Sequence, residues 1–224
     1  MLEHEKTIYF ERMAFIIEMP IKKKLFGQEL NLTIAGVKAY NQDNLYSNSS
    51  NSLQSFKVAI GFKVKVCTNL CIFTDGANLN LKAHSIEDLQ TQIKQLFLLY
   101  SDTAQLEALQ TFGDYTLSEI QFATILEKTR LYNFLPRDTK KDIPEFIISD
   151  TQVNAAAKQY YKDEYFRRNK DGSINLWNVY NLLTDGVKNS DIDTFLDRNL
   201  NTFEFTQGIA KALEGESEYG WFLN

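Results

Sequence analysis

The sequence predicts an α+β protein in which an N-terminal antiparallel sheet of about four strands precedes a mostly helical C-terminal two thirds. Two observations support this prediction. Apolar and polar residues alternate over much of the first third, as in strands with one buried face. Beyond Ser85, apolar residues instead recur every three to four positions, which indicates helices. We expect a single domain over residues 1–224, with the sheet within 8–76 and the helices within 85–224.

The strands follow from the alternating runs and the turn residues between them. Met13–Met19 and Leu30–Val37 form the first expected hairpin, with Lys22–Lys24 in the basic turn between them. Phe56–Val66 is the third expected strand, because apolar residues alternate with lysine over its second half. Cys71–Phe73 is expected to add a short fourth strand.

The helices follow from capping patterns and apolar spacing. Ser85–Asp88 has the hydroxyl-x-x-acid order of a capping box, and Thr116–Glu119 repeats it. The helix that starts there should end at Leu135–Pro136, because a proline disfavours the helical conformation in the residue before it. Apolar spacing predicts the remaining helices within Ser149–Phe166, Leu176–Leu183 and Ile192–Leu213.

Composition narrows the function classes. Hydrophobic residues make up 44% and aromatics 13% of the 224 residues, enough for a well-filled core. A formal net charge of -5 gives no general attraction to phosphate, so any nucleic-acid contact needs a local basic patch. No apolar run approaches the roughly 20 residues of a membrane span, and no signal peptide is evident. With only two cysteines and no disulfide framework, we expect a cytoplasmic protein without a membrane partner.

Common catalytic and metal signatures are weak. The two histidines are too few for a multi-histidine site, and no nucleotide-binding glycine loop occurs. Residues 167–178 resemble a calcium loop at Asn169, Asp171 and Gly172, with Ile174 in the eighth position. Its first and twelfth positions hold Arg167 and Asn178, which lack the carboxylates that the ion needs. We therefore expect no metal and no cofactor, and interpret Asp171–Gly172 as the turn before the helix that carries Trp177.

Asparagine-rich segments are the best candidates for a polar site. Asn and Asp side chains hydrogen-bond nearby backbone, and they also suit ligands with donors and acceptors. The candidates lie at two expected strand ends and on one helical face, and they are Asn41, Asp43, Asn44, Asn69, Asn178 and Asn181. General grounds favour an internal network that fastens a loop to a helix over a ligand site.

A basic and aromatic patch is the candidate nucleic-acid surface. Lysines on one face of the third expected strand, with arginines near a helix end rich in tyrosine, could follow a single strand by charge and stacking. These candidates are Lys57, Lys63, Lys65, Arg167 and Arg168. The alternative is ordinary solvated charge on an open sheet face.

Three motifs in order carry a family resemblance. They are Tyr40–Leu45, Val66–Leu70 and Asn175–Thr184. The chain resembles, from Glu5 to Asn224, an uncharacterised domain-of-unknown-function family of gut bacteria. More distantly it is similar to the phage/plasmid-like family of unknown function, which usually has His-Asp-Gly where this chain has Gln42–Asn44. The resemblance implies a mobile-element context, in which DNA transactions concentrate, and it supplies no catalytic residue.

Three functional hypotheses follow. The first is a non-enzymatic accessory protein of DNA transactions that binds single-stranded nucleic acid. The second is an enzyme whose polar pocket joins Asp43 and Asn69 to the Asn178 and Asn181 face. The third is a structural or assembly protein in which the asparagine networks only hold the fold together. The residues favour a non-enzymatic role and leave all three open.

Overall fold

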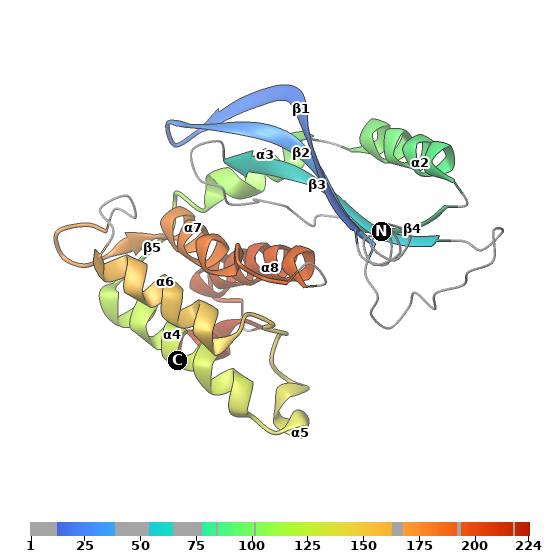
Figure 1. Cartoon of the computed structure of the whole chain (residues 1–224). Coiled ribbons are helices and arrows are strands. Elements are labelled where there is room, and N and C mark those ends of the chain that lie inside the picture. Colours follow the sequence, from blue (N-terminus) through green and yellow to red (C-terminus); the bar gives the residue numbers. More distant parts are fainter. Residues whose placement is uncertain are drawn as a thin grey trace, which may run out of the picture.

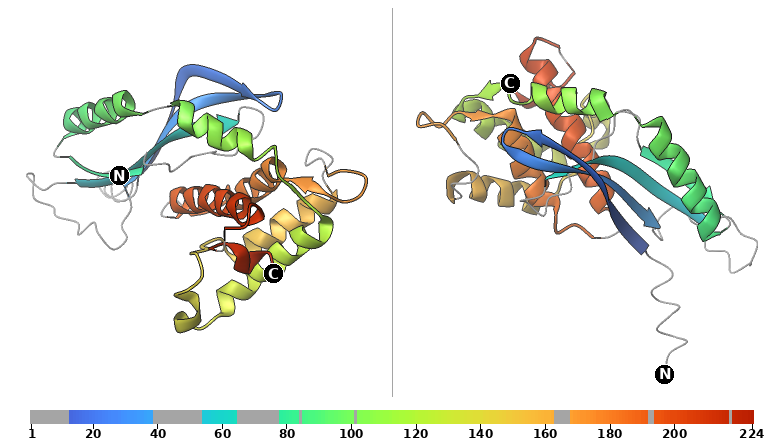
Figure 2. Two further views of the ribbon diagram at one scale, coloured as in Figure 1. Left: turned by 180° about the vertical axis from the view of Figure 1, so that it is seen from behind. Right: turned by 90° about the horizontal axis from the view of Figure 1, so that it is seen from above.

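A computed structural model describes residues 13–38, 54–64, 78–83, 85–100, 102–162, 168–191, 194–216 and 218–224. The sheet occupies one end of the molecule, and the helices α4, α6, α7 and α8 gather at the other (Figures 1 and 2). In chain order the elements are β1 (Met13–Leu25), β2 (Gln28–Lys38), β3 (Gln54–Val64), β4 (Asn78–Ala83), α2 (Ile86–Leu99), α3 (Asp102–Thr111), β5 (Thr116–Leu117), α4 (Glu119–Phe134), α5 (Arg137–Lys140), α6 (Asp150–Lys162), β6 (Ile174–Asn175), α7 (Leu176–Val187), α8 (Phe195–Leu213) and the 3-10 turn η1 (Gly220–Phe222).

The predicted α+β class and its antiparallel sheet are confirmed. The four strands pair as neighbours in the order β1-β2-β3-β4, with Ile34 of β2 opposite Ile17 of β1 and Ile60 of β3. The fourth strand is β4, which the alternation did not reveal, and the expected strand Cys71–Phe73 lies outside the described residues.

The position of the first turn corrects the prediction. Lys22–Lys24 belong to β1, and Phe26 and Gly27 form the turn. Both turn residues have positive φ, 47° at Phe26 and 78° at Gly27, as a tight connection between antiparallel strands requires. An aromatic residue rarely adopts this conformation, so the sequence pattern did not place the turn there.

One face of the sheet joins the main core. The alternate residues Leu30, Leu32 and Ile34 of β2 and Ile60 and Phe62 of β3 are at most 3% exposed. They belong to the same apolar cluster as Leu89 and Leu96 of α2. Burial of these side chains drives the sheet and α2 together, at roughly 1.5–3 kcal/mol for each large side chain.

Local caps define the helices, with one corrected start. The Ser85 hydroxyl accepts from the Asp88 N–H at 3.2 Å, as predicted. The second predicted cap lies two residues later, at Ser118, where Gln121 completes a capping box. Thr116 and Leu117 are not helical because they pair with Asn175 and Ile174. Helix α3 was not predicted, since its apolar residues do not form a strong stripe.

Aromatic rings form the core of the helical half. Phe203 of α8 lies 5.6 Å from the Phe112 ring and 6.3 Å from the Tyr180 ring of α7, measured between ring centroids. Further along α8, Phe205 contacts Phe146 and Phe222, both at 4.9 Å. Helix α8 therefore packs against α7, against η1 and against the segments that carry Phe112 and Phe146, while α6 packs between α7 and α4.

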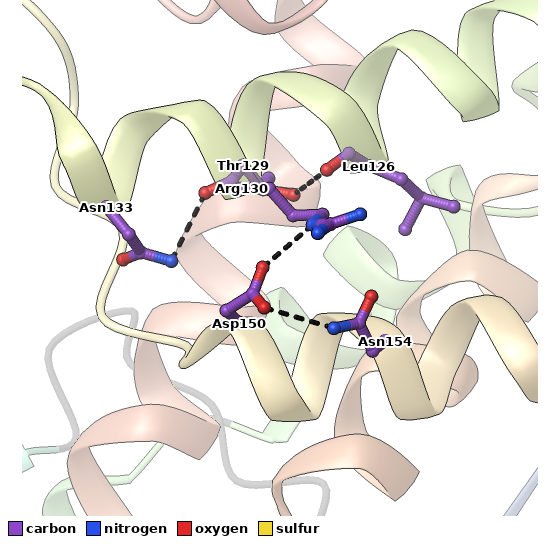
Figure 3. Close-up of polar contacts among 6 residues, drawn as sticks. All are labelled: Leu126, Thr129, Arg130, Asn133, Asp150 and Asn154. Atoms are coloured by element: carbon purple, nitrogen blue, oxygen red, sulfur yellow. Dashed lines mark hydrogen bonds and ion pairs between the residues drawn. The ribbon is translucent and has the colours of Figure 1, made fainter.

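Helices α4 and α6 lie side by side and are joined by a polar contact (Figure 3). The Arg130 Nε donates to Asp150 Oδ1 at 2.8 Å, and Asn154 Nδ2 donates to Asp150 Oδ2 at 3.1 Å. Asp150 is in the first turn of α6, where the helix dipole also favours a carboxylate. Because Arg130 and Asp150 are both well exposed, this contact contributes only about 0–1 kcal/mol.

Candidate functional site

Lys57 and Lys63 share the second face of the sheet, as their spacing predicts. Lys63 lies opposite Asn31, and Lys57 lies opposite Val37. We call this surface the lysine face. Lys65, also expected there, lies outside the described residues.

Glu18 of β1 lies at one end of the lysine face and contacts both Lys63 and Asn31. Its carboxylate accepts from Lys63 Nζ at 2.7 Å through Oε1 and from Asn31 Nδ2 at 3.2 Å through Oε2. Asn31 is only 8% exposed, so its amide is arranged largely out of water. Glu18 of β1 thus reaches Lys63 of β3 across the intervening β2, and this partly exposed ion pair contributes about 0–1 kcal/mol.

Helix α8 occupies the other end of the lysine face. Lys57 Nζ forms an ion pair with Asp197, which lies in the first turn of α8. Beside this pair, small sheet residues pack against the start of α8 in a second apolar cluster, which contains Ala35, Val37, Ala59, Phe195, Leu196 and Leu200. The predicted lysine row is therefore divided, with Lys57 beneath α8 and Lys63 nearer the β1–β2 turn.

The tip of the β1–β2 hairpin combines basic and aromatic side chains. Lys22 forms an ion pair with Glu29 at 3.0 Å, and Lys24 is exposed and forms no ion pair within the described residues. The Phe26 ring is 48% exposed, and one side of it lies 5.3 Å from the Trp177 ring between centroids. We call Lys22, Lys24, Phe26 and the nearby Lys63 the hairpin end.

Asn175, the last residue of β6, and Asn181 of α7 form hydrogen bonds to the backbone of α7. Asn175 caps the helix by accepting from the Asn178 N–H at 2.9 Å. Asn181 is 4% exposed, and its Nδ2 donates to the Trp177 carbonyl at 2.8 Å. The other candidates of the polar site lie outside the described residues, and they are Asn41, Asp43, Asn44 and Asn69.

Arg168 lies in the helical half, away from the lysine face. Its guanidinium carbon is 5.3 Å from the centroid of the Tyr160 ring and 5.4 Å from that of Tyr161. The Tyr160 hydroxyl donates to the Gly172 carbonyl. Burial, with a smaller contribution from Glu119, raises the pKa of Tyr160, so this hydroxyl stays a donor at neutral pH. Arg167, the other predicted arginine, is outside the described residues.

An apolar groove lies between the sheet and α2, and sequence reasoning did not anticipate it. The groove has a volume of about 440 Å³ and is lined by Ile17, Met19, Ile34, Gln90, Ile93, Lys94, Phe97 and Leu98. Leu98 is 80% exposed and Ile17 is 45% exposed, so the apolar surface continues outward. The regular spacing of apolar residues on α2 was the available signal, but that spacing alone cannot separate a filled core from an open groove.

Within the described ranges, no three His, Cys, Asp or Glu side chains come together as a metal site would require. None of the described helices is both long enough and apolar enough to cross a membrane.

The fold and these surfaces define an α+β protein with a four-stranded meander, a helical half in which α7 contacts both α6 and α8, and polar clusters made of ion pairs and helix caps. The chain belongs to a family whose description reads "Domain of unknown function, B. Theta Gene description (DUF3871)", and the match covers residues 1–223. The predicted membership of an uncharacterised family of gut bacteria is thereby confirmed. Neither the curated proteins nor the solved structures contain a match to this chain.

Proposed function

We propose that this protein is a non-enzymatic accessory protein of DNA transactions that binds single-stranded nucleic acid weakly through the hairpin end. One observation carries the proposal, namely that a half-exposed Phe26 ring lies on the short turn that follows Lys22 and Lys24 of β1. Aromatic rings stack on bases of any sequence, and lysines pair with the phosphates between them.

The ion pairs of the hairpin end leave room for a phosphate. Lys22 and Glu29 have 57% and 31% of their side-chain surface exposed, and such pairs contribute only about 0–1 kcal/mol. A phosphate can therefore replace the Glu29 carboxylate as the partner of Lys22 at small cost. Lys24 can bind a phosphate directly, because it forms no ion pair within the described residues. The net charge of -5 works against long-range attraction, so the affinity should be low and should fall steeply with salt.

The proposal uses only part of the predicted patch. It includes Lys63, which lies on the same side of the sheet as Lys22. It does not need Lys57, which pairs with Asp197 of α8, or Arg168, which covers two tyrosines in the helical half. A mobile-element setting stays part of the proposal and rests on the distant sequence resemblance alone.

The test is a titration of labelled oligothymidine at low salt, followed by fluorescence anisotropy. We expect a dissociation constant on the order of 10⁻⁵ M, and a double variant Lys22→Ala/Lys24→Ala with weaker binding. The slope of log K against log salt should become shallower by about 1.4, because two phosphate contacts are lost. Phe26→Leu should weaken binding without changing that slope.

Matched controls lie in the helical half. Lys158→Ala/Lys211→Ala removes the same charge from exposed positions on α6 and α8, and Phe134→Leu changes an exposed ring of α4. These variants should bind like the wild type. An absence of binding at low salt, or an equal loss in the control double variant, contradicts the proposal.

A structural or assembly role is the second candidate, and the apolar groove favours it. Exposed Leu98 and Ile17 beside a groove of about 440 Å³ form a surface that a second copy of the chain could cover. Sedimentation velocity over a range of concentrations should then show association that Leu98→Asp abolishes. A wild-type protein that stays monomeric at every concentration argues against this role.

An enzymatic role is the remaining alternative. It requires Asp43 and Asn69 to reach the Asn178 and Asn181 face, and those first two residues are outside the described ranges. The amide of Asn181 is engaged with the backbone of its own helix. The described residues therefore supply less support for an enzyme than for a binding protein.

A further inference from the structure

The helical half contains two helix–loop–helix units joined at their loops. The first unit is α3, β5 and α4, and the second is α6, β6 and α7. The short strands β5 and β6 pair antiparallel, with Leu117 opposite Ile174 and Thr116 opposite Asn175. In each unit the second helix starts directly after or one residue after its strand, so the two loops meet back to back.

The two exit helices begin in the same way. Ser118 caps α4 by accepting from the backbone N–H of Gln121, and Asn175 caps α7 by accepting from that of Asn178. Residues 167–178 of the second unit also align with a calcium loop, which makes Asn178 its twelfth position. That position supplies the bidentate carboxylate in calcium-binding hands, and Gln121 is its counterpart in the first unit.

The second loop has the backbone turn of a calcium hand. Gly172 occupies the sixth position, where such loops require glycine for a sharp turn, and its φ is +81°. Ile174 occupies the eighth position and is the residue that pairs across to the other unit. The loop backbone and its pairing therefore agree with the sequence match, although the ligand positions at the two ends do not.

Two of the oxygens that an ion would bind in this loop accept hydrogen bonds from this chain's own groups. Asp171 Oδ1, at the fifth position, accepts from the N–H and the hydroxyl of Ser173 at 3.0 and 2.7 Å. The Ser173 carbonyl, at the seventh position, accepts from the Asn169 N–H at 2.7 Å. The Asn169 Nδ2, at the third position, donates to the Ser173 hydroxyl at 2.8 Å.

A second set of contacts closes the loop from outside. The Tyr160 hydroxyl of α6 donates to the Gly172 carbonyl, so the helix before the loop holds its turn directly. Arg168 places a positive charge over the Tyr160 ring at the start of the loop. Hydrogen bonds and one cation over an aromatic ring thus hold the loop in shape, which a bound ion does in a calcium hand.

We propose that residues 102–187 form a pair of calcium-hand-type units in which internal side-chain contacts have replaced the ion, so that the pair folds without a divalent cation. The proposal concerns the helical half and is independent of the hairpin end. Its two parts are separable, because the hand-type geometry and the independence from metal are measured in different variants.

The experiment uses terbium luminescence excited through Trp177, together with competition by Ca²⁺, on the full chain. The wild type should show no sensitised emission and the same melting temperature in Ca²⁺ and in chelator. The triple variant Arg167→Asp/Asn169→Asp/Asn178→Glu places carboxylates at the first, third and twelfth positions. It should bind terbium and should show Ca²⁺ competition in the range of about 10⁻⁴–10⁻³ M that is typical of weak calcium sites.

The control is Arg137→Asp/Gln95→Glu/Asn189→Asp, which makes the same charge changes at exposed positions outside the loop. It should bind no terbium. Metal binding or Ca²⁺-dependent stabilisation of the wild type overturns the independence from metal. Failure of the triple variant to bind, when circular dichroism shows that it is folded, overturns the hand-type geometry. Binding by the control variant shows that added charge alone explains the signal and overturns the geometry as well.

Discussion

The hairpin end and the loop Arg168–Ser173 are two turns built from similar residues but with different surroundings. Each has a glycine with positive φ, 78° at Gly27 and 81° at Gly172, and each has basic and aromatic neighbours. A Cβ on Gly27 would have no atom within 4 Å, whereas one on Gly172 would lie 2.5 Å from Glu119 Oε2. The open turn at Gly27 therefore leaves its basic and aromatic side chains exposed to solvent. The enclosed turn at Gly172 uses similar residues in contacts that stabilise the fold.

The largest expected effect comes from filling the two glycine positions. Gly27→Ala should lower the free energy of unfolding by about 1 kcal/mol, because alanine is disfavoured at positive φ. Gly172→Ala should cost about 2 kcal/mol, since it adds displacement of the Glu119 side chain to the same backbone cost. Urea unfolding followed by circular dichroism measures both. Equal losses would show that the enclosed turn is no more constrained than the open one.

A smaller difference is expected between two adjacent tyrosines of α6. Tyr160→Phe removes the donor to the Gly172 carbonyl and should cost about 1 kcal/mol. Tyr161→Phe is the matched control, because Tyr161 is 57% exposed and its hydroxyl makes only a 3.4 Å contact with Glu119. Thermal unfolding should show a melting temperature lower by about 2–4 °C for the first variant alone. A similar loss in both variants contradicts the role given to Tyr160.

The smallest effect is expected in the pH dependence of stability at acidic pH. Hydrogen bonds from Ser173 lower the pKa of the Asp171 carboxyl in the folded protein. A lowered pKa means that this contribution to stability is present above the ordinary value of about 4 and is lost as the pH falls through the folded value. Asp171→Asn should therefore make stability less dependent on pH below about 4, as measured by urea unfolding at several pH values. An unchanged pH dependence argues against a carboxylate held by Ser173.

The sequence predicted the classes of element better than their ends. The alternation in β2 and β3 and the cap at Ser85 are local signals, and the corresponding elements are present. The start of α4 is different, because Thr116 and Ser118 both suit a cap and only the pairing of Thr116 with Asn175 decides between them. That contact joins residues far apart in the chain, which no local pattern contains.

The candidate surfaces also depend on contacts that no local sequence pattern contains. The spacing of Lys57 and Lys63 correctly predicted a shared face, but the partner of Lys57 is Asp197, which is 140 residues away. Asn178 and Asn181 were recognised as polar positions on a helix. In the structure the Asn178 N–H donates to the Asn175 side chain, and the Asn181 side chain donates to the Trp177 carbonyl. Phe26 was not recognised, because an aromatic turn residue with positive φ has no sequence signal.

Hydrogen exchange of the full chain with and without oligothymidine, read by mass spectrometry, tests the contrast between the two turns most directly. The account predicts slower exchange in peptides from residues 20–30 when the oligonucleotide is present, and unchanged exchange in peptides from residues 168–176. Slower exchange at 168–176, or no change at 20–30 under conditions in which the oligonucleotide binds, would contradict it.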